Sequence, residues 1–143
     1  MRSLYEREYE MDSLRKPIGI VTTKNLDGDD VYGGIYGLEL LLDCRLCTVE
    51  KFTEKSVRRY LKKLIKLIKM EAGLDPIFVK GIHGLDVIQF ILSSQIAVHC
   101  VDYLGAVFID IFSCKDFDTG DALQFTQEWF ESKDVRGHIV YRD

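Results

Sequence analysis

Two segments rich in β-branched residues carry the side chains best suited to chemistry. The first begins with Ser93-Ser94 and contains His99, and the second ends at Cys114. A hydroxyl can act as a nucleophile, and an imidazole and a thiol can transfer protons near neutral pH, since their unperturbed pKa values are about 6.5 and 8.5. The pattern predicts a β-hairpin with a serine at the start of its first strand and a thiol at the end of its second.

Taken one at a time, these residues favour structural interpretations. A serine pair commonly satisfies backbone groups where a strand begins. A histidine on a strand is more often a hydrogen-bonded core residue than a catalyst, and a cysteine after apolar residues is more often a small buried hydrophobe. Only the joint spacing of Ser94, His99 and Cys114 supports a catalytic interpretation.

That spacing resembles the prokaryotic S-adenosylmethionine decarboxylases. Their precursor cleaves itself before a serine and has a histidine five residues on and a cysteine twenty residues on, as Ser94, His99 and Cys114 stand here. Gly84 adds to the resemblance, and the run 108–114 is similar to the family's Asp-Val-Phe-Thr-Cys segment. The resemblance extends from about Gly37 to the C-terminus.

The resemblance implies a self-cleaving, pyruvoyl-dependent decarboxylase of polyamine (spermidine) biosynthesis. Cleavage between Ser93 and Ser94 would turn Ser94 into the pyruvoyl cofactor, a ketone that condenses with a substrate amine and accepts the electron pair left by carbon dioxide. In the family the histidine is the processing base and the cysteine returns a proton, so the catalytic residues would be Ser94, His99 and Cys114. The family is dimeric with facing sheets.

The chain departs from the family pattern at several positions. Ser93 stands where the family has Glu, and residues 100–103 replace a Thr-Trp-Pro-Glu motif in which the tryptophan stacks on adenine and the glutamate binds substrate. The second stacking aromatic would fall near Lys80. The family's cleavage chemistry therefore fits this chain, whereas its nucleoside pocket has been rebuilt or lost.

Three residues are predicted to bind the small-molecule substrate: Asp102, Tyr103 and Asp110. Tyr103 could replace one stacking ring, and the carboxylates could bind a cation. We expect S-adenosylmethionine as the substrate on the resemblance alone, with arginine or ornithine as the alternative. A further alternative is an unprocessed, non-catalytic relative that acts as a binding or regulatory partner.

The hydrophobic pattern predicts the elements that position these residues. Strands are expected at 35–42, 77–80, 86–92, 95–101, 106–113 and 135–141. Thr53 is expected to cap a helix that stops at Gly73, and the capping groups of 118–121 to begin a second helix. These segments predict an α+β fold, an S-adenosylmethionine decarboxylase-like two-layer sandwich with helices on one face of an antiparallel sheet, in the order β-α-β-β-β-α-β.

The domain is expected at residues 34–143, after an N-terminal extension at 1–33. In the strand 106–113, Val107, Ile109 and Ile111 lie on one side, and Phe108 and Phe112 lie on the other. Because neither side is typical of a solvated face, we expect a homodimer that covers the face without helices.

Composition limits the other functions. The 143 residues carry a net charge of −4, but residues 51–69 hold eight Lys or Arg against Glu54 alone, which leaves about −11 on the rest. A basic helix face on an acidic chain is usually solvated, so no nucleic-acid partner is predicted. No segment has the roughly 18 apolar residues of a membrane span and the N-terminus lacks a signal-peptide pattern, so we expect a cytoplasmic protein with no membrane partner.

The four cysteines are expected to be reduced in that compartment. Cys44 and Cys47 form a Cys-x-x-Cys pair, but no second close pair of Cys or His follows. We therefore predict no metal site and no redox role for them.

Overall fold

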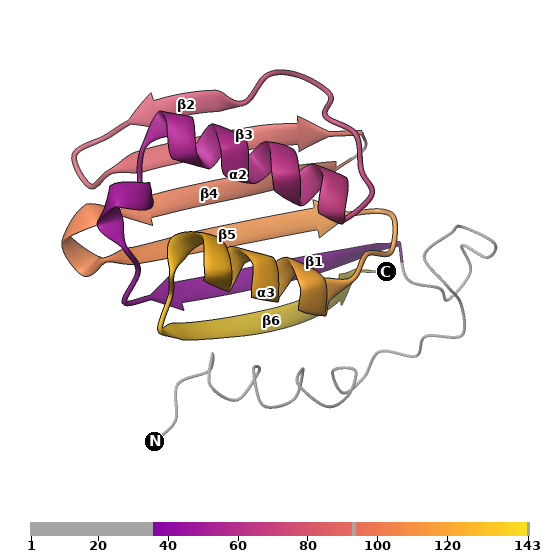
Figure 1. The fold of residues 1–143 in the computed structure, drawn as a ribbon. Coiled ribbons are helices and arrows are strands. Elements are labelled where there is room, and N and C mark those ends of the chain that lie inside the picture. Colours follow the sequence, from indigo (N-terminus) through magenta and orange to yellow (C-terminus); the bar gives the residue numbers. More distant parts are fainter. Residues whose placement is uncertain (1–35, 93, 143) are drawn as a thin grey trace.

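The chain folds into two layers, one antiparallel sheet and two helices that cover one of its faces (Figure 1). This computed structural model describes residues 36–92 and 94–142. The six strands lie in the order β2-β3-β4-β5-β1-β6. The elements are β1 (Gly37–Arg45), the 3-10 helix η1 (Val49–Lys51), α2 (Glu54–Leu67), β2 (Ile77–Lys80), β3 (Leu85–Ile91), β4 (Ser94–Val101), the 3-10 helix η2 (Asp102–Leu104), β5 (Ala106–Ser113), α3 (Thr119–Phe130) and β6 (Asp134–Arg142).

The predicted α+β class and the placement of both helices on one face are confirmed. The predicted order was one strand short, because four strands separate the helices and the order is β-α-β-β-β-β-α-β. All four of these strands were predicted, including β2, a short edge strand that pairs only with β3, so the error lay in the stated order alone. The structure does not test the boundary between an extension at 1–33 and a domain at 34–143, since residues 1–35 lie outside the described residues.

Helix α2 begins as predicted but ends earlier. The Thr53 side chain accepts a hydrogen bond from the Ser56 N–H (3.2 Å), which caps the first turn. The helix ends at Leu67 because Lys69 adopts a left-handed conformation (φ 59°) and the Met70 N–H turns back to the Ile65 carbonyl. This ending resembles a Schellman motif without its usual glycine, so the sequence carried no signal for it.

The core lies between the helices and the covered face of the sheet. Alternate residues of the central strands point toward the helices and are buried, and α2 contributes its apolar side to the same core. The largest buried members are Tyr60, Phe130, Leu40, Leu42, Leu61, Leu64, Ile96, Ile109 and Ile111.

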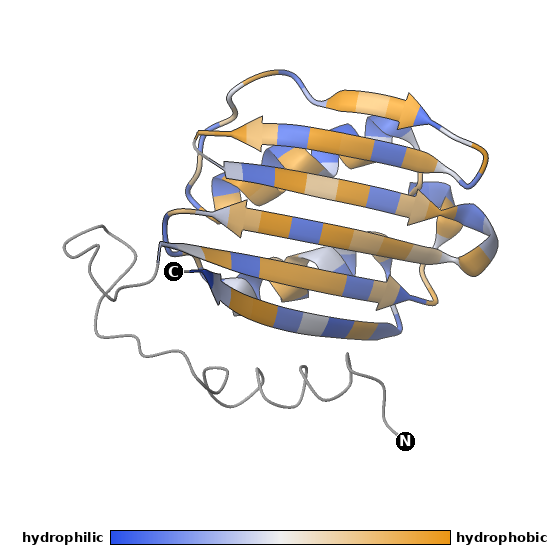
Figure 2. Cartoon of the chain, turned by 180° about the vertical axis from the view of Figure 1, so that it is seen from behind, coloured by the Kyte–Doolittle hydropathy of each residue, from blue (hydrophilic) through white to orange (hydrophobic). Residues whose placement is uncertain are grey.

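None of the helices that the structure describes lies over the other face of the sheet (Figure 2). It mixes apolar and charged residues: Ile77, Val79, Ile88 and Phe90 are 42–58% exposed, and charged side chains stand among them. We call this surface the open face. Among the described residues, no helix is long and apolar enough to cross a membrane.

Candidate active site

The Ser94 side chain, on the side covered by the helices, meets the backbone of Cys114 at one end of the sheet. Ser94 is the first residue of β4, and Cys114 directly follows β5. The Ser94 Oγ accepts a hydrogen bond from the Cys114 backbone N–H at 3.3 Å, and Ser94 is only 9% exposed. The structure therefore brings together two of the three residues predicted to be catalytic. Ser93 lies outside the described residues.

The segment that carries Cys114 is held by its neighbour Ser113, which sequence reasoning did not single out. Ser113 is fully buried, and its Oγ accepts a hydrogen bond from the Lys115 N–H at 2.9 Å. The same hydroxyl lies 4.0 Å from the Met70 sulfur, beyond the end of α2. These contacts fix the turn after β5 and so position Cys114.

A cleft of about 500 Å³ begins one residue beyond Cys114. It lies between the C-terminal end of α2, the loop 115–118 and the first turn of α3, and it carries charges of both signs. Ser94 and Cys114 do not line it; its lining residues are Leu67, Ile68, Lys69, Lys115, Asp116, Phe117, Asp118 and Asp121.

His99 lies on the open face, away from Ser94. Side chains alternate along a strand, so residues five apart point to opposite faces, and five residues span about 16 Å. In β4 the alternation buries Ser94 against the helices and exposes His99 on the other side. Within one chain, His99 therefore does not meet Ser94.

His99 instead pairs with Asp86, which sequence reasoning missed. The two residues stand opposite each other in the β3–β4 hairpin, and His99 Nδ1 lies 3.0 Å from Asp86 Oδ1. When Nδ1–H donates to this carboxylate, Nε2 is left to accept a proton. The predicted strands, 86–92 and 95–101, would pair Asp86 with Val101 across a two-residue turn. The observed register, with Ile91 opposite Ser94, places Asp86 opposite His99 instead.

Two of the predicted substrate-binding residues, Asp102 and Tyr103, lie at the opposite end of β4. They form the start of η2, and the eight residues from Ser94 to Asp102 span about 26 Å. Both are exposed, and the Tyr103 ring packs against His83 with 5.7 Å between centroids. One chain therefore does not bring them to a small substrate held at Ser94.

Asp110, the third predicted substrate-binding residue, lies near the middle of β5 on the open face, between Leu41 and Ala97. Its pKa is raised above the usual value, first because burial disfavours the ionised form and then because Glu39 and Asp43 are close by; His99 opposes this shift. Like His99, Asp110 belongs to the open face and not to the Ser94 end.

The Cys44–Cys47 pair is buried in packing. Cys44 is fully buried, and the Cys47 thiol points at the Cys44 carbonyl oxygen at 3.4 Å. Burial, followed by the nearby Cys47 and Asp43, raises the pKa of Cys44 to about 12, so its thiol stays protonated. In the described part of the chain, no group of three His, Cys, Asp or Glu side chains is placed to bind a metal ion.

An antiparallel sheet with helices on one face and a serine–cysteine pair at its end define an α+β two-layer domain with a candidate nucleophile. The family model described as S-adenosylmethionine decarboxylase matches residues 38–143. This is most of the chain, and the chain belongs to that family. The family is one of decarboxylases, which indicates a carboxy-lyase with a small-molecule substrate.

A solved structure supports the same fold. The crystal structure of the adenosylmethionine decarboxylase from Aquifex aeolicus VF5 matches with a TM-score of 0.67, and it covers 76% of this chain and 91% of that chain. The two sequences are 16% identical, so this likeness concerns the fold alone. No curated protein sequence matches the chain significantly.

Proposed function

We propose that this chain is a pyruvoyl-dependent decarboxylase that cleaves itself between Ser93 and Ser94. The observation that carries the proposal is the hydrogen bond between the Ser94 Oγ and the Cys114 N–H, within a domain of the S-adenosylmethionine decarboxylase family. A backbone N–H that donates to Oγ favours negative charge on that oxygen as it attacks. A cytoplasmic role in polyamine (spermidine) biosynthesis belongs to the same proposal.

The proposed cleavage needs only the chain and water. The Ser94 Oγ adds to the carbonyl carbon of Ser93 and gives up its proton, and the peptide C–N bond breaks as an ester forms. Loss of the Ser94 Cα proton then expels the Ser93 carboxylate and leaves dehydroalanine at position 94. Water hydrolyses this group with release of ammonia, which leaves a ketone at position 94.

Cys114 is the proposed proton donor in the decarboxylation. The ketone at position 94 would act as the electron sink for the pair left by carbon dioxide. The Cys114 backbone is hydrogen-bonded to Ser94, and its partly exposed thiol is carried at the same end of the sheet. A thiol placed there can return a proton to the substrate carbon.

His99 can serve as the processing base only if a second copy of the chain brings it to Ser94. Within one chain the two side chains point to opposite faces of β4. We therefore propose a homodimer as part of the mechanism. The open face, with Ile77, Val79 and Phe90 exposed, is an apolar surface available for a homodimer. Because Ser94 faces the helices at the start of β4, the contact that brings His99 to it must also reach that end of the sheet.

The proposed substrate is S-adenosylmethionine, with arginine or ornithine as alternatives. The alternatives depended on carboxylates near the ketone, and Asp102 and Asp110 both lie away from Ser94 in the single chain. Carbon dioxide release from the three compounds in parallel tests the choice. We expect release of carbon dioxide from S-adenosylmethionine alone. Release only from arginine or ornithine would reverse the choice of substrate.

A non-catalytic relative is the second candidate. The separation of Ser94 from His99 and the serine in place of glutamate at position 93 favour it. The test is fragment analysis of purified chains. Two fragments from the wild-type chain, but one intact chain from Ser94→Ala, would support the decarboxylase. An intact wild-type chain that co-purifies with a cleaved relative would support the second candidate.

A further inference from the structure

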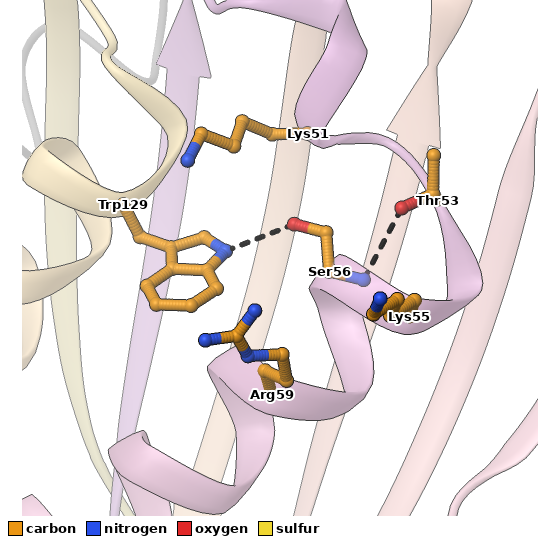
Figure 3. Close-up of a pocket in the computed structure, with 6 residues that line it drawn as sticks. All are labelled: Lys51, Thr53, Lys55, Ser56, Arg59 and Trp129. Atoms are coloured by element: carbon orange, nitrogen blue, oxygen red, sulfur yellow. Dashed lines mark hydrogen bonds between the residues drawn. The ribbon is translucent and has the colours of Figure 1, made fainter.

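A second site lies at the other end of α2, on the outer side of the helical layer. A cavity of about 340 Å³ opens between η1, the first turns of α2 and the C-terminal half of α3. Three cations, two hydroxyls and an aromatic ring line it: Lys51, Lys55, Arg59, Thr53, Ser56 and Trp129 (Figure 3). No carboxylate is among these lining residues, so the cavity has a single sign of charge.

The three cations have no carboxylate partner in the described part of the chain. Among the described residues, the ion pair formed within α2 is that of Arg58 with Glu54, at 3.2 Å. Lys55 and Arg59 are four residues apart on the helix, and like charges at this spacing repel each other. An anion in the cavity would relieve that repulsion.

Trp129 forms a fixed wall of the cavity. Its indole Nε1 donates a hydrogen bond to the Ser56 Oγ at 3.2 Å, and the rings of Tyr60 and Phe125 pack against it with centroid distances of 6.2 and 5.9 Å. The Lys51 ammonium lies 5.4 Å from the centre of the indole ring. The aromatic wall is therefore held in place before any ligand arrives.

The start of α2 adds partial positive charge to the same place. Thr53 caps the Ser56 N–H, and the helix that follows has 14 residues. A helix of this length presents the positive end of its dipole and unpaired N–H groups at its first turn. This contribution supports the cations that line the cavity.

We propose that this cavity binds a small phosphate-bearing molecule of the pyrophosphate or nucleotide class. Arg59 offers planar, paired donors that match phosphate oxygens, and Lys51 and Lys55 add two charges that a diphosphate can neutralise. The flat face of Trp129 can pack against a base or sugar. The remaining surface of the acidic chain disfavours a long polyanion, so a small ligand fits better than nucleic acid.

The site is separate from the candidate active site. Ser94 and Cys114 lie beyond the C-terminal end of α2, where Met70 contacts Ser113, whereas the cavity lies at its N-terminal end. A 14-residue helix is about 21 Å long. The ligand at this site would therefore not contact the residues proposed to react.

The tryptophan provides the readout, because Trp129 is the single tryptophan of the chain. The full chain is titrated with pyrophosphate at constant ionic strength while tryptophan fluorescence is followed, and binding of ADP and of a short single-stranded RNA is measured by calorimetry. Saturable change with pyrophosphate and at least as tight binding of ADP are expected. The same change with sodium chloride at equal ionic strength would overturn the proposal.

Substitutions locate the binding. Arg59→Gln should weaken pyrophosphate binding by about ten-fold or more, as expected for the loss of a charge-assisted pair. Lys66→Gln removes the same charge from the same helix outside the cavity and should change binding less than two-fold. If the Arg59→Gln variant fails to fold, Lys55→Gln serves as the test variant in its place. Equal weakening in Lys66→Gln, or tighter binding of RNA than of ADP, would contradict the site.

Discussion

At the scale of single residues, the hydrogen bond from the Cys114 N–H to the Ser94 Oγ links the two candidate catalytic residues that the structure brings together. It joins the first residue of β4 to the residue after β5, and it lies at a buried strand end. The sequence suggested the pair only through its spacing. The sequence also contained the alternation that separates His99 from Ser94, because an odd spacing on a strand reverses the face.

Asp110 provides a prediction on pH. Its pKa is raised in the folded chain, chiefly by burial, so the folded chain holds this proton over a pH range in which the unfolded chain has lost it. Above the folded pKa, the ionised carboxylate therefore lowers the free energy of unfolding by its full amount. Below the unfolded pKa of about 3.9, it has no effect. Asp110→Asn should be more stable than wild type at neutral pH, lose that advantage as the pH falls through the folded pKa, and have none left below about 4.

Urea unfolding of both chains over this pH range, at one protein concentration, measures the difference. Asp75→Asn, at an exposed aspartate, controls for the loss of a negative charge. An Asp110→Asn variant that is less stable than wild type at neutral pH would show that the carboxylate makes a favourable contact there.

At the scale of elements, the strands and helix starts could be predicted and several contacts between them could not. The strand 77–80, the strand 106–113 and the caps Thr53 and Asp118 follow local rules. The end of α2 could not be predicted by such rules, because Lys69 takes a left-handed conformation that usually belongs to glycine.

The placement of η2 far from Ser94 was also missed. Asp102 follows the Ser94 strand closely in sequence, but a strand is extended and carries its two ends far apart. The open face was anticipated, because the strand 106–113 is apolar on both sides.

A substitution at Gly84 tests the contact between the β2–β3 turn and β4. Gly84 has φ 143°, a conformation nearly confined to glycine, and a Cβ there would overlap the Cys100 carbonyl oxygen. Gly84→Ala should lower the free energy of unfolding by at least ~1–3 kcal/mol. The matched control is Gly73→Ala, whose Cβ would meet its nearest atom at an ordinary 3.5 Å. Equal effects of the two substitutions on denaturant unfolding would contradict this explanation.

The two helices are joined by a buried hydrogen bond. The Tyr60 hydroxyl lies 2.7 Å from the Thr126 Oγ1, which in turn donates to the Ala122 carbonyl. Thr126→Val leaves the Tyr60 hydroxyl buried without this partner and should cost ~1–3 kcal/mol of stability.

Tyr60→Phe combined with Thr126→Val should recover part of that loss, because both polar partners are then removed. A double-mutant cycle by urea unfolding measures the coupling. Purely additive losses would show that the hydrogen bond contributes nothing of its own.

At the scale of the whole molecule, the proposed mechanism requires two chains. If His99 acts on the Ser94 of another subunit, a His99→Ala chain alone should stay intact. A mixture with Ser94→Ala chains, which keep their histidine, should then cleave the His99→Ala chains. Distinct affinity tags and co-expression allow fragments of each chain to be followed. Cleavage of His99→Ala alone, or no cleavage in the mixture, would rule out this arrangement.

The most direct test of the central claim is the mass of the chain after purification. Self-cleavage at Ser94 predicts a fragment of residues 1–93 and a fragment of 94–143 that is lighter by one ammonia than simple hydrolysis would give. The second fragment should gain the mass of H₂ when borohydride reduces its ketone. Ser94→Ala should give the full-length mass. A wild-type chain that keeps its full-length mass after prolonged incubation would contradict the claim.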